Sequence, residues 1–189
     1  MKVFFHFAVN CFSNTYLIGP EGPGDAILVD PGILDSALLR LIEDHRYYVR
    51  SILVTHAHES HVHGIKTLLK IYEAEIYAST HRVLECPCTI VADGQTLEIS
   101  GFRVQTIGVP GHSSDSIAYR IGDMLFTGDT LAAGTIGPTP NGYARALLIQ
   151  NIKEKLLTLP ESLTVLPGHG PPSSIAVERL SNPALREKL

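Results

Sequence analysis

The fold is decided by the stretch Thr55-His56-Ala57-His58-Glu59-Ser60-His61-Val62-His63-Gly64, which directly follows the apolar run Ser51-Ile52-Leu53-Val54. A short apolar, β-branched run of this kind predicts a buried strand. His56 and His58 are two residues apart, so their side chains leave the same face of an extended chain. His61 follows three residues later, where the pattern becomes typical of a helix. A turn from strand to helix at this point would bring the imidazoles close together, and imidazoles are standard ligands for zinc and iron. A solvated, His-rich loop is the alternative.

Length and composition are typical of one globular domain spanning residues 1–189. Hydrophobic residues make up 44% of the chain, charged residues 18%, and the net charge is -4. This mild acidity argues against a nucleic-acid surface, and no apolar run approaches the ~20 residues of a membrane span. His6 and Asn10 interrupt the apolar first dozen residues, which we interpret as a strand and not as a signal peptide. We expect a small-molecule substrate, with neither nucleic acid nor membrane as partner; the oligomeric state stays open.

The three cysteines are an odd number, and Cys86-Pro87-Cys88 places two of them too close together for an ordinary disulfide framework. This usage predicts free thiols in a reducing compartment, and therefore a cytoplasmic protein. A second metal site at Cys86 and Cys88 is the alternative, although the further ligands it needs are not evident nearby in the sequence.

Strands and helices alternate along the rest of the chain. The predicted strands are Val3–Val9, Asn14–Ile18, Ala26–Asp30, Glu75–Ala78, Thr96–Ile99, Phe102–Ile107, Ser116–Arg120, Met124–Thr127 and Leu163–Leu166. The predicted helices are Ile33–Arg46, Val62–Lys70, Ala144–Leu159 and Ser174–Leu180. The Gly/Pro-rich segment Gly134–Gly142 is longer than most connections, so we expect a functional loop that borders a pocket. Meandering strands with interspersed helices predict an α/β (α+β) architecture of two sheets covered by helices.

Three further stretches each place a potential ligand beside a turn glycine at the end of a strand. They are Val109-Pro110-Gly111-His112-Ser113, Leu125-Phe126-Thr127-Gly128-Asp129-Thr130 and Leu166-Pro167-Gly168-His169-Gly170. With the histidine stretch, they resemble the metallo-beta-lactamase superfamily, whose motif is His-x-His-x-Asp-His followed by Gly-His, Gly-Asp and a final Gly-His. The resemblance covers almost the whole chain and implies an αββα sandwich. The spacing looks most like the short glyoxalase II-like branch, which lacks the helical C-terminal domain of full-length glyoxalase II.

The resemblance implies two neighbouring metal positions. Carried over residue by residue, the implied ligands are His56, His58 and His112 for the first metal, His61 and His169 for the second, and Asp129 between them. The implied cofactor is zinc, as one or two ions, with iron possible. Three histidines and an open position are the arrangement that lowers the pKa of bound water toward ~7. Asp129 and His112 are the implied catalytic residues, Asp129 orienting the hydroxide or accepting its proton.

Ser60 stands where the motif of the family has an aspartate. A neutral hydroxyl is a poor substitute for a carboxylate toward a dication, so the second metal position is predicted to be the weaker one. Glu59 and His63 could compensate. In an extended chain, however, the Glu59 side chain turns to the opposite face, and on a helix His63 points about 200° away from His61. We interpret His63 as a surface residue, and we expect ordinary surface or core roles for His6, His45 and His81.

The substrate side also departs from the family pattern. In glyoxalase II-like proteins a basic residue commonly follows the glycine in the loop after the Gly-Asp motif, but here Pro138 follows Gly137. The basic residues that hold glutathione in the helical domain have no counterpart in this short chain. Tyr143 and Arg145 could contact substrate, or could serve packing and solvation instead. The resemblance therefore implies a glutathione thioester, and these departures weaken that expectation.

Three hypotheses follow. The first is a metal-dependent hydrolase of a thioester or related ester, with hydroxide supplied at His56, His58 and His112. The second resembles the persulfide dioxygenases of this superfamily, oxidoreductases whose single iron is held by residues matching His56, His112 and Asp129. The third is a catalytically degenerate metal-binding protein, because a fold does not imply a particular reaction.

Overall fold

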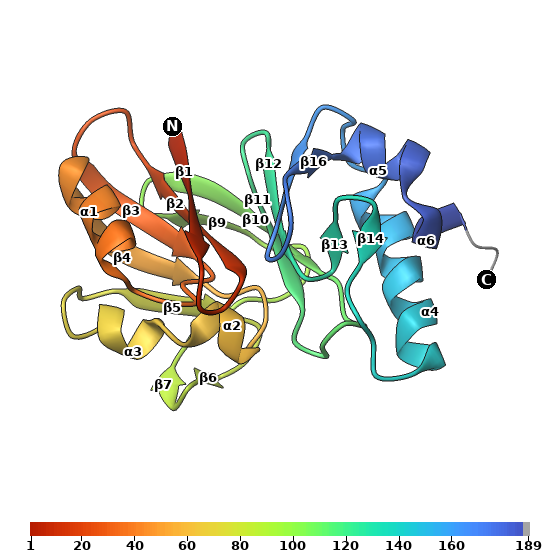
Figure 1. Cartoon of the computed structure of the whole chain (residues 1–189), viewed down its shortest axis with the longest axis horizontal. Coiled ribbons are helices and arrows are strands. Elements are labelled where there is room, and N and C mark those ends of the chain that lie inside the picture. The colour runs from red at the N-terminus through yellow and green to blue at the C-terminus, as the bar shows by residue number, and fades with distance from the viewer. Residues whose placement is uncertain (187–189) are drawn as a thin grey trace.

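Two six-stranded sheets form the centre of the computed structural model, which describes residues 1–186 (Figure 1). The first sheet has the strand order β1-β2-β3-β4-β5-β8. Its strands are β1 (Lys2–Ala8), β2 (Ser13–Gly19), β3 (Gly24–Val29), β4 (Tyr47–Leu53), β5 (Glu75–Ala78) and β8 (Thr89–Ile90). The first three strands are antiparallel, and β3, β4, β5 and β8 pair in parallel.

The second sheet has the strand order β16-β15-β12-β11-β10-β9. Its strands are β9 (Thr96–Ile99), β10 (Phe102–Gly108), β11 (Ile117–Ile121), β12 (Met124–Gly128), β15 (Thr164–Pro167) and β16 (Ser173–Ser174). Neighbouring strands are antiparallel except β12 and β15, which are parallel. The carboxyl ends of β12 and β15 therefore lie at the same edge of this sheet, and the Gly-Asp motif and the last Gly-His motif directly follow them.

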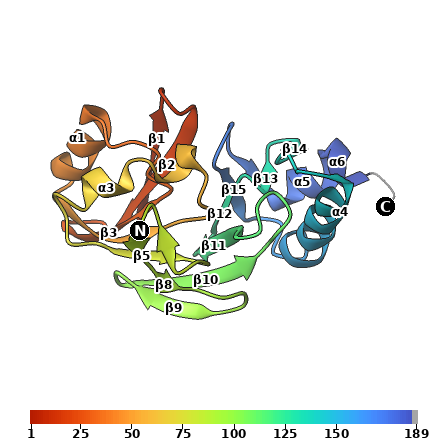
Figure 2. The ribbon, with the colours of Figure 1, turned by 90° about the horizontal axis from the view of Figure 1, so that it is seen from below.

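Helices cover the two outer faces of the paired sheets (Figure 2). Those on the first sheet are α1 (Ser36–Asp44), α2 (Glu59–Val62) and α3 (Ile65–Leu68). Those on the second are α4 (Gly142–Asn151), continued by the π-helical turn η1 (Ile152–Leu156), α5 (Ile175–Ser181) and α6 (Pro183–Arg186). None of the helices in residues 1–186 is long and apolar enough to cross a membrane.

Alternating side chains divide the apolar residues into three layers. In β3, Leu28 packs with the helices on the outer face, whereas its neighbour Ile27 packs between the sheets. In β12, Phe126 packs between the sheets, whereas Leu125 packs against the helices of the second sheet. Successive residues of a strand point to opposite faces, so each sheet is buried on both sides. The result is the αββα sandwich that the sequence predicts.

Two predicted segments differ from the structure. The helix expected from Val62 to Lys70 is split into α2 and α3, because the chain at Gly64 lies against the loop before α1. A Cβ at Gly64 would be 2.6 Å from the Pro31 carbonyl oxygen. The segment Gly134–Gly142 is not wholly a loop, since it contains β14 (Thr135–Ile136), which pairs with β13 (Leu131–Ala132). Another small hairpin, β6 (Arg82–Val83) with β7 (Cys86–Pro87), was also not predicted.

Candidate metal centre

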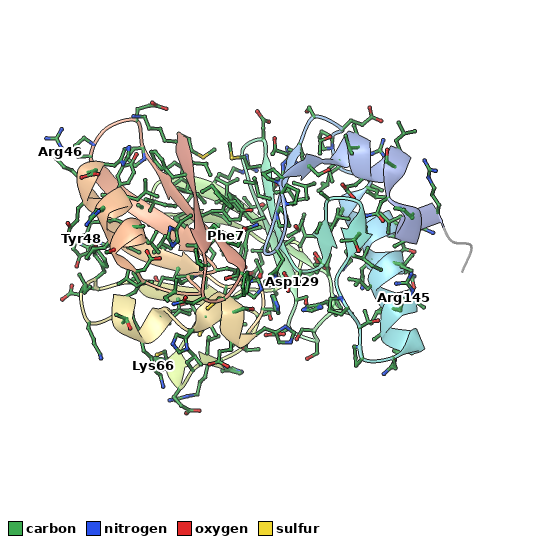
Figure 3. The ribbon with its side chains drawn as sticks, in the orientation of Figure 1. Phe7, Arg46, Tyr48, Lys66, Asp129 and Arg145 are labelled. Carbon is green, nitrogen blue, oxygen red and sulfur yellow. The ribbon has the colours of Figure 1, made fainter. Side chains whose placement is uncertain are left out.

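The four sequence motifs converge at one edge of the sandwich. His56 and His58 follow β4, His112 follows β10, Asp129 follows β12 and His169 follows β15. Figure 3 shows Asp129 near the middle of the molecule, where both sheets end. The ligand atoms of two sets of residues lie within 4.8 Å of one another: His56, His58, His112 and Asp129 in the first set, and His61, Asp129 and His169 in the second. The structure thus brings all six candidate ligands together.

The first set presents three imidazole nitrogens and a carboxylate oxygen to one point. His58 Nδ1 lies 3.0 Å from both His56 Nε2 and His112 Nε2. Asp129 Oδ2 lies 3.9 Å from His56 Nε2 and 3.8 Å from His112 Nε2. Ligand atoms ~2.0–2.1 Å from a tetrahedral zinc ion lie roughly 3.3 Å apart, so this spacing and donor set fit a transition-metal dication.

The second set shares Asp129 with the first. His61 Nε2 lies 3.4 Å from Asp129 Oδ2, and His169 Nδ1 lies 2.7 Å from Asp129 Oδ1. His61 is fully buried, yet its Nε2 has no hydrogen-bond partner. A buried polar atom without a partner is costly, and a metal ion between His61, Asp129 and His169 would satisfy it. These residues also fit a metal, with one ligand fewer than the first set.

Neighbouring hydrogen bonds orient the imidazoles toward the cluster. His112 Nδ1 donates to the Pro138 carbonyl oxygen at 2.7 Å, which leaves Nε2 with its lone pair. Thr55 Oγ1 donates to Asp30 Oδ2 at 2.6 Å, so it accepts from His56 Nδ1 at 3.0 Å. Each ring therefore turns its unprotonated nitrogen inward, as metal-binding histidines do when another group holds their N–H.

Asp30 organises the second set in the same way. Its Oδ2 lies 3.0 Å from His61 Nδ1, and its Oδ1 accepts the Thr55 amide at 2.8 Å. Asp30 is buried and has a positive φ of 49°, which is uncommon for a residue with a side chain. The buried carboxylate therefore fixes both the strand-end backbone and the His61 ring.

The protein groups also set the charges of the cluster. Burial, together with the positive charge of His61, lowers the pKa of His56 to about 3. Burial alone would lower the pKa of His61, but the carboxylates of Asp30 and Asp129 raise it to about 10. Burial likewise opposes ionisation of Asp129, yet the hydrogen bond from His169 and the nearby His61 imidazole hold its pKa well below the usual range. In the first set, the neutral His56 imidazole and the Asp129 carboxylate thus present electron pairs to the centre, as a cation requires, whereas His61 must release a proton before it can bind one.

A glycine is needed where the last motif passes the cluster. A Cβ at Gly168 would lie 2.3 Å from His61 Cε1 and 2.7 Å from Asp129 Oδ1. No real side chain tolerates such distances, so the backbone can pass this close to the ligands only as glycine. The turn glycine that the sequence places beside a ligand has a steric reason here.

The structure places neither Glu59 nor His63 among the ligands. Glu59 Oε1 and His63 Nδ1 lie 3.4 Å apart, and both side chains are well exposed on the surface. The interpretation of His63 as a surface residue is confirmed.

Ser60 is half-buried in α2, where its carbonyl oxygen accepts the Ser13 hydroxyl at 2.6 Å. No carboxylate of the described residues takes the place that Ser60 leaves in the second set.

The remaining candidates lie away from the cluster. His6 pairs with Asp35 at 3.3 Å, His45 stacks on Tyr47, and His81 is exposed. Cys86 and Cys88 are free thiols, and within residues 1–186 they belong to no group of three potential metal ligands. The alternative of a second metal site at these cysteines therefore has no structural support.

Two cavities flank the cluster. Cavity A, of about 550 Å³, is lined by Asp129, Ala132, Ala133, Thr135, Ile136, Gly137, Pro138, His169, Gly170 and Pro171. Cavity B, of about 540 Å³, is lined by His58, Pro110, Gly111, His112, Ser113, Ser114, Pro140, Tyr143, Ala144 and Leu147. The segment Gly134–Gly142 contributes to both, which confirms that it borders a pocket. Tyr143 lines cavity B, whereas Arg145 lines neither.

Sequence reasoning did not assign the residues that support the ligands. Asp30 was predicted only as the last residue of the strand Ala26–Asp30, and a carboxylate at the end of a buried strand was the available signal. Asp115 was also missed: its Oδ2 accepts the Ala57 amide at 2.9 Å, between two histidine ligands, and its Oδ1 accepts the Ser113 hydroxyl. Only the polar run after His112 pointed to it.

The chain belongs to the metallo-beta-lactamase superfamily, whose family model matches residues 8–86 and 87–169. The chain is 30% identical to a hydroxyacylglutathione hydrolase of Salmonella arizonae over 86% of its own length, and spans 64% of that protein. It is likewise 30% identical to a probable polyketide biosynthesis zinc-dependent hydrolase, BaeB, of Bacillus velezensis, with 82% of this chain and 71% of that one covered.

Solved structures share the fold. ETHE1 from Myxococcus xanthus superimposes with a TM-score of 0.87 at 29% identity, with 97% of this chain and 84% of that one covered. TTHA1623, solved in a di-iron-bound form, has a TM-score of 0.79 at 28% identity, with 95% of this chain and 98% of that one covered. These relatives include a zinc-dependent protein and an iron-bound one, so the metal-binding character is common to them and the choice of metal differs.

Proposed function

We propose that this protein is a metal-dependent hydrolase of a thioester or related ester, with zinc as its metal. The observation that carries the proposal is the convergence of His58 Nδ1, His56 Nε2, His112 Nε2 and Asp129 Oδ2 between two cavities. Three imidazoles beside one carboxylate are an arrangement used to activate water, and two of these rings, His56 and His112, are held by second hydrogen bonds. The names of the Salmonella and Bacillus relatives, both hydrolases, support the same class of reaction.

The substrate carbonyl would lie at the ligand cluster, with its two arms in cavities A and B. His56, His58 and His112 would hold the metal ion, which would supply a Lewis acid to activate water and polarise the carbonyl. Water adds to the carbonyl carbon, the carbon–sulfur bond breaks, and the products are a carboxylic acid and a thiol. Asp129 lines cavity A beside the imidazole nitrogens, so its Oδ2 can accept a proton from the attacking water and return it to the leaving sulfur.

Release of a thiol is the direct test of this reaction. Protein stripped with a chelator and then reloaded with zinc should release thiol from S-hexanoyl-N-acetylcysteamine, and the stripped protein should not. His112→Ala removes a ligand of the first set and should abolish the reaction. Exposed His81 does not belong to the cluster, so His81→Ala is the matched control and should retain activity. Equal rates for stripped and reloaded protein would contradict the proposal.

A second candidate is an oxidoreductase of the persulfide dioxygenase type with one iron. The specific observation in its favour is Ser60, since the second set has only His61, His169 and a share of Asp129. His56, His112 and Asp129 form a two-histidine, one-carboxylate set of the kind that binds non-haem iron. Oxygen uptake with glutathione persulfide by the iron-loaded protein, without thioester hydrolysis by the zinc-loaded form, would favour this candidate.

A further inference from the structure

We infer that the substrate is a thioester with an uncharged, apolar acyl chain and a thiol arm that carries no carboxylate. This inference rests on the proposed function, and it concerns what cavities A and B can hold. It departs from the glutathione thioester that the family resemblance implies, because glutathione carries two carboxylates.

Cavity A is suited to the acyl chain. Its walls away from the metal ligands are the side chains of Ala132, Ala133, Ile136, Pro138 and Pro171, together with two glycines and one polar residue, Thr135. The Thr135 hydroxyl donates to the Ile136 carbonyl oxygen at 3.3 Å, and the other side chains of these walls offer no hydrogen-bond donor. The volume of about 550 Å³ lies in the range of small-molecule sites. An aliphatic chain would exchange water for carbon contacts here, whereas a charged group would lose its hydration without a partner.

Cavity B is suited to an uncharged arm with polar groups. Its walls combine Leu147, Pro110 and Pro140 with the hydroxyls of Ser114 and Tyr143. Hydroxyl groups both donate and accept hydrogen bonds, so they can satisfy the amides of a neutral thiol arm. This difference between the walls assigns the acyl chain to cavity A and the thiol arm to cavity B.

No cationic side chain is available to hold a carboxylate. Among residues 1–186, neither cavity is lined by a lysine or an arginine. Pro138 lines cavity A at the position where a basic residue commonly stands in glyoxalase II-like proteins. Arg145 is the basic residue nearest to Pro138 in the sequence. It lies on α4, to the right of Asp129 in Figure 3, and lines neither cavity. Apart from the metal centre, carboxylates of glutathione would therefore meet no opposite charge.

The inference predicts how strongly kcat/KM should depend on the length of the acyl chain. Burial of one methylene group is worth ~0.8 kcal/mol, or roughly fourfold in an equilibrium or rate constant. Allowing for an open cavity, we expect a twofold to fourfold gain for each added methylene. Between the acetyl and pentanoyl esters, three methylenes would raise kcat/KM by about 10- to 60-fold.

The test uses two readouts on the zinc-loaded protein. The first is kcat/KM for acetyl, butanoyl, pentanoyl and octanoyl esters of N-acetylcysteamine, compared with the same esters of glutathione. The second is calorimetric binding of the matching S-alkyl thioethers, which cannot be hydrolysed. We expect both to rise with chain length, and the N-acetylcysteamine compounds to exceed their glutathione counterparts at equal length.

A variant tests the assignment of cavity A. Ala133 lies in the short turn between β13 and β14 and is half-buried, so a larger side chain there can project into the cavity without disturbing the core. Ala133→Phe should lower the octanoyl-to-acetyl ratio of kcat/KM by about 10-fold or more. The corresponding ratio of thioether affinities should fall to a similar extent. Exposed Ala92 lines neither cavity, so Ala92→Phe is the matched control and should leave the ratio unchanged.

The outcomes separate the inference from the proposed function. Faster hydrolysis of glutathione esters, or binding that is independent of chain length, would overturn the inference and leave the hydrolase intact. Chain-length-dependent thioether binding without hydrolysis of any thioester would support the inference about the cavities and contradict the proposed reaction. An unchanged octanoyl-to-acetyl ratio in Ala133→Phe would overturn the assignment of the acyl chain to cavity A.

Discussion

Replacing Ser60 by aspartate should strengthen the second metal position. That position has two imidazoles, from His61 and His169, and shares Asp129 with the first position. Two dications would thus face a single carboxylate, and Ser60→Asp adds a second negative charge where the family motif has one. The backbone at this residue is held by the hydrogen bond from Ser13 to the Ser60 carbonyl, 2.6 Å long, so the new side chain should not require rearrangement of the chain.

The expected gain follows from ligand chemistry. Groups that support a metal ligand typically change affinity by 10–100-fold, so an added carboxylate should tighten the second zinc by at least ~10-fold, or ~1.4 kcal/mol. Competition with a chromophoric chelator gives both dissociation constants, and mass spectrometry gives the zinc content at stoichiometric supply. Ser60→Asn has the same shape without the charge and should not strengthen binding. Wild-type protein that already holds two zinc ions at stoichiometric supply, or equal effects of both variants, would refute the reasoning.

Further substitutions test the site and its surroundings. Asp129→Asn should lower thioester kcat/KM by about 10²–10⁴-fold, because the proton acceptor is lost; a smaller loss would place the acceptor elsewhere. Gly168→Ala should weaken zinc binding, since a Cβ there would meet two ligand side chains, whereas Gly22→Ala, with no atom within 4 Å, should not. Burial opposes ionisation of Asp93, but its hydrogen bond from Lys155 holds its pKa below the usual value. Its contribution to stability is therefore present above the usual aspartate pKa near ~4 and lost at lower pH. Asp93→Asn should flatten that acid limb in urea titrations, by less than ~1 kcal/mol because the pair is exposed.

The sequence was sufficient for the sandwich and for the set of candidate ligands. Alternating or continuous apolar runs marked the long strands, such as β10 (Phe102–Gly108) and β12 (Met124–Gly128), because their side chains face defined layers. The family order of the motifs placed His56, His112 and His169 at strand ends, and the structure brings these residues together. Whether they bind metal stays a prediction.

Features that depend on tertiary contacts were missed. Two-residue strands such as β13 (Leu131–Ala132) and β14 (Thr135–Ile136) have no periodicity to detect. The break between α2 and α3 arises from close contact of Gly64 with Pro31, which lies far from it in the chain. The support of His61 by Asp30 likewise joins residues 31 positions apart. Such pairings follow from the three-dimensional arrangement, and no local pattern encodes them.

The most direct test of the account is a zinc titration of the stripped protein with thiol release as the readout. We predict that activity on S-hexanoyl-N-acetylcysteamine rises in proportion to the first zinc bound and approaches its maximum near one zinc per chain. A chelator should then abolish the activity, and added zinc should restore it. Full occupancy of the site by zinc without any release of thiol would contradict the central claim that this metal centre hydrolyses thioesters.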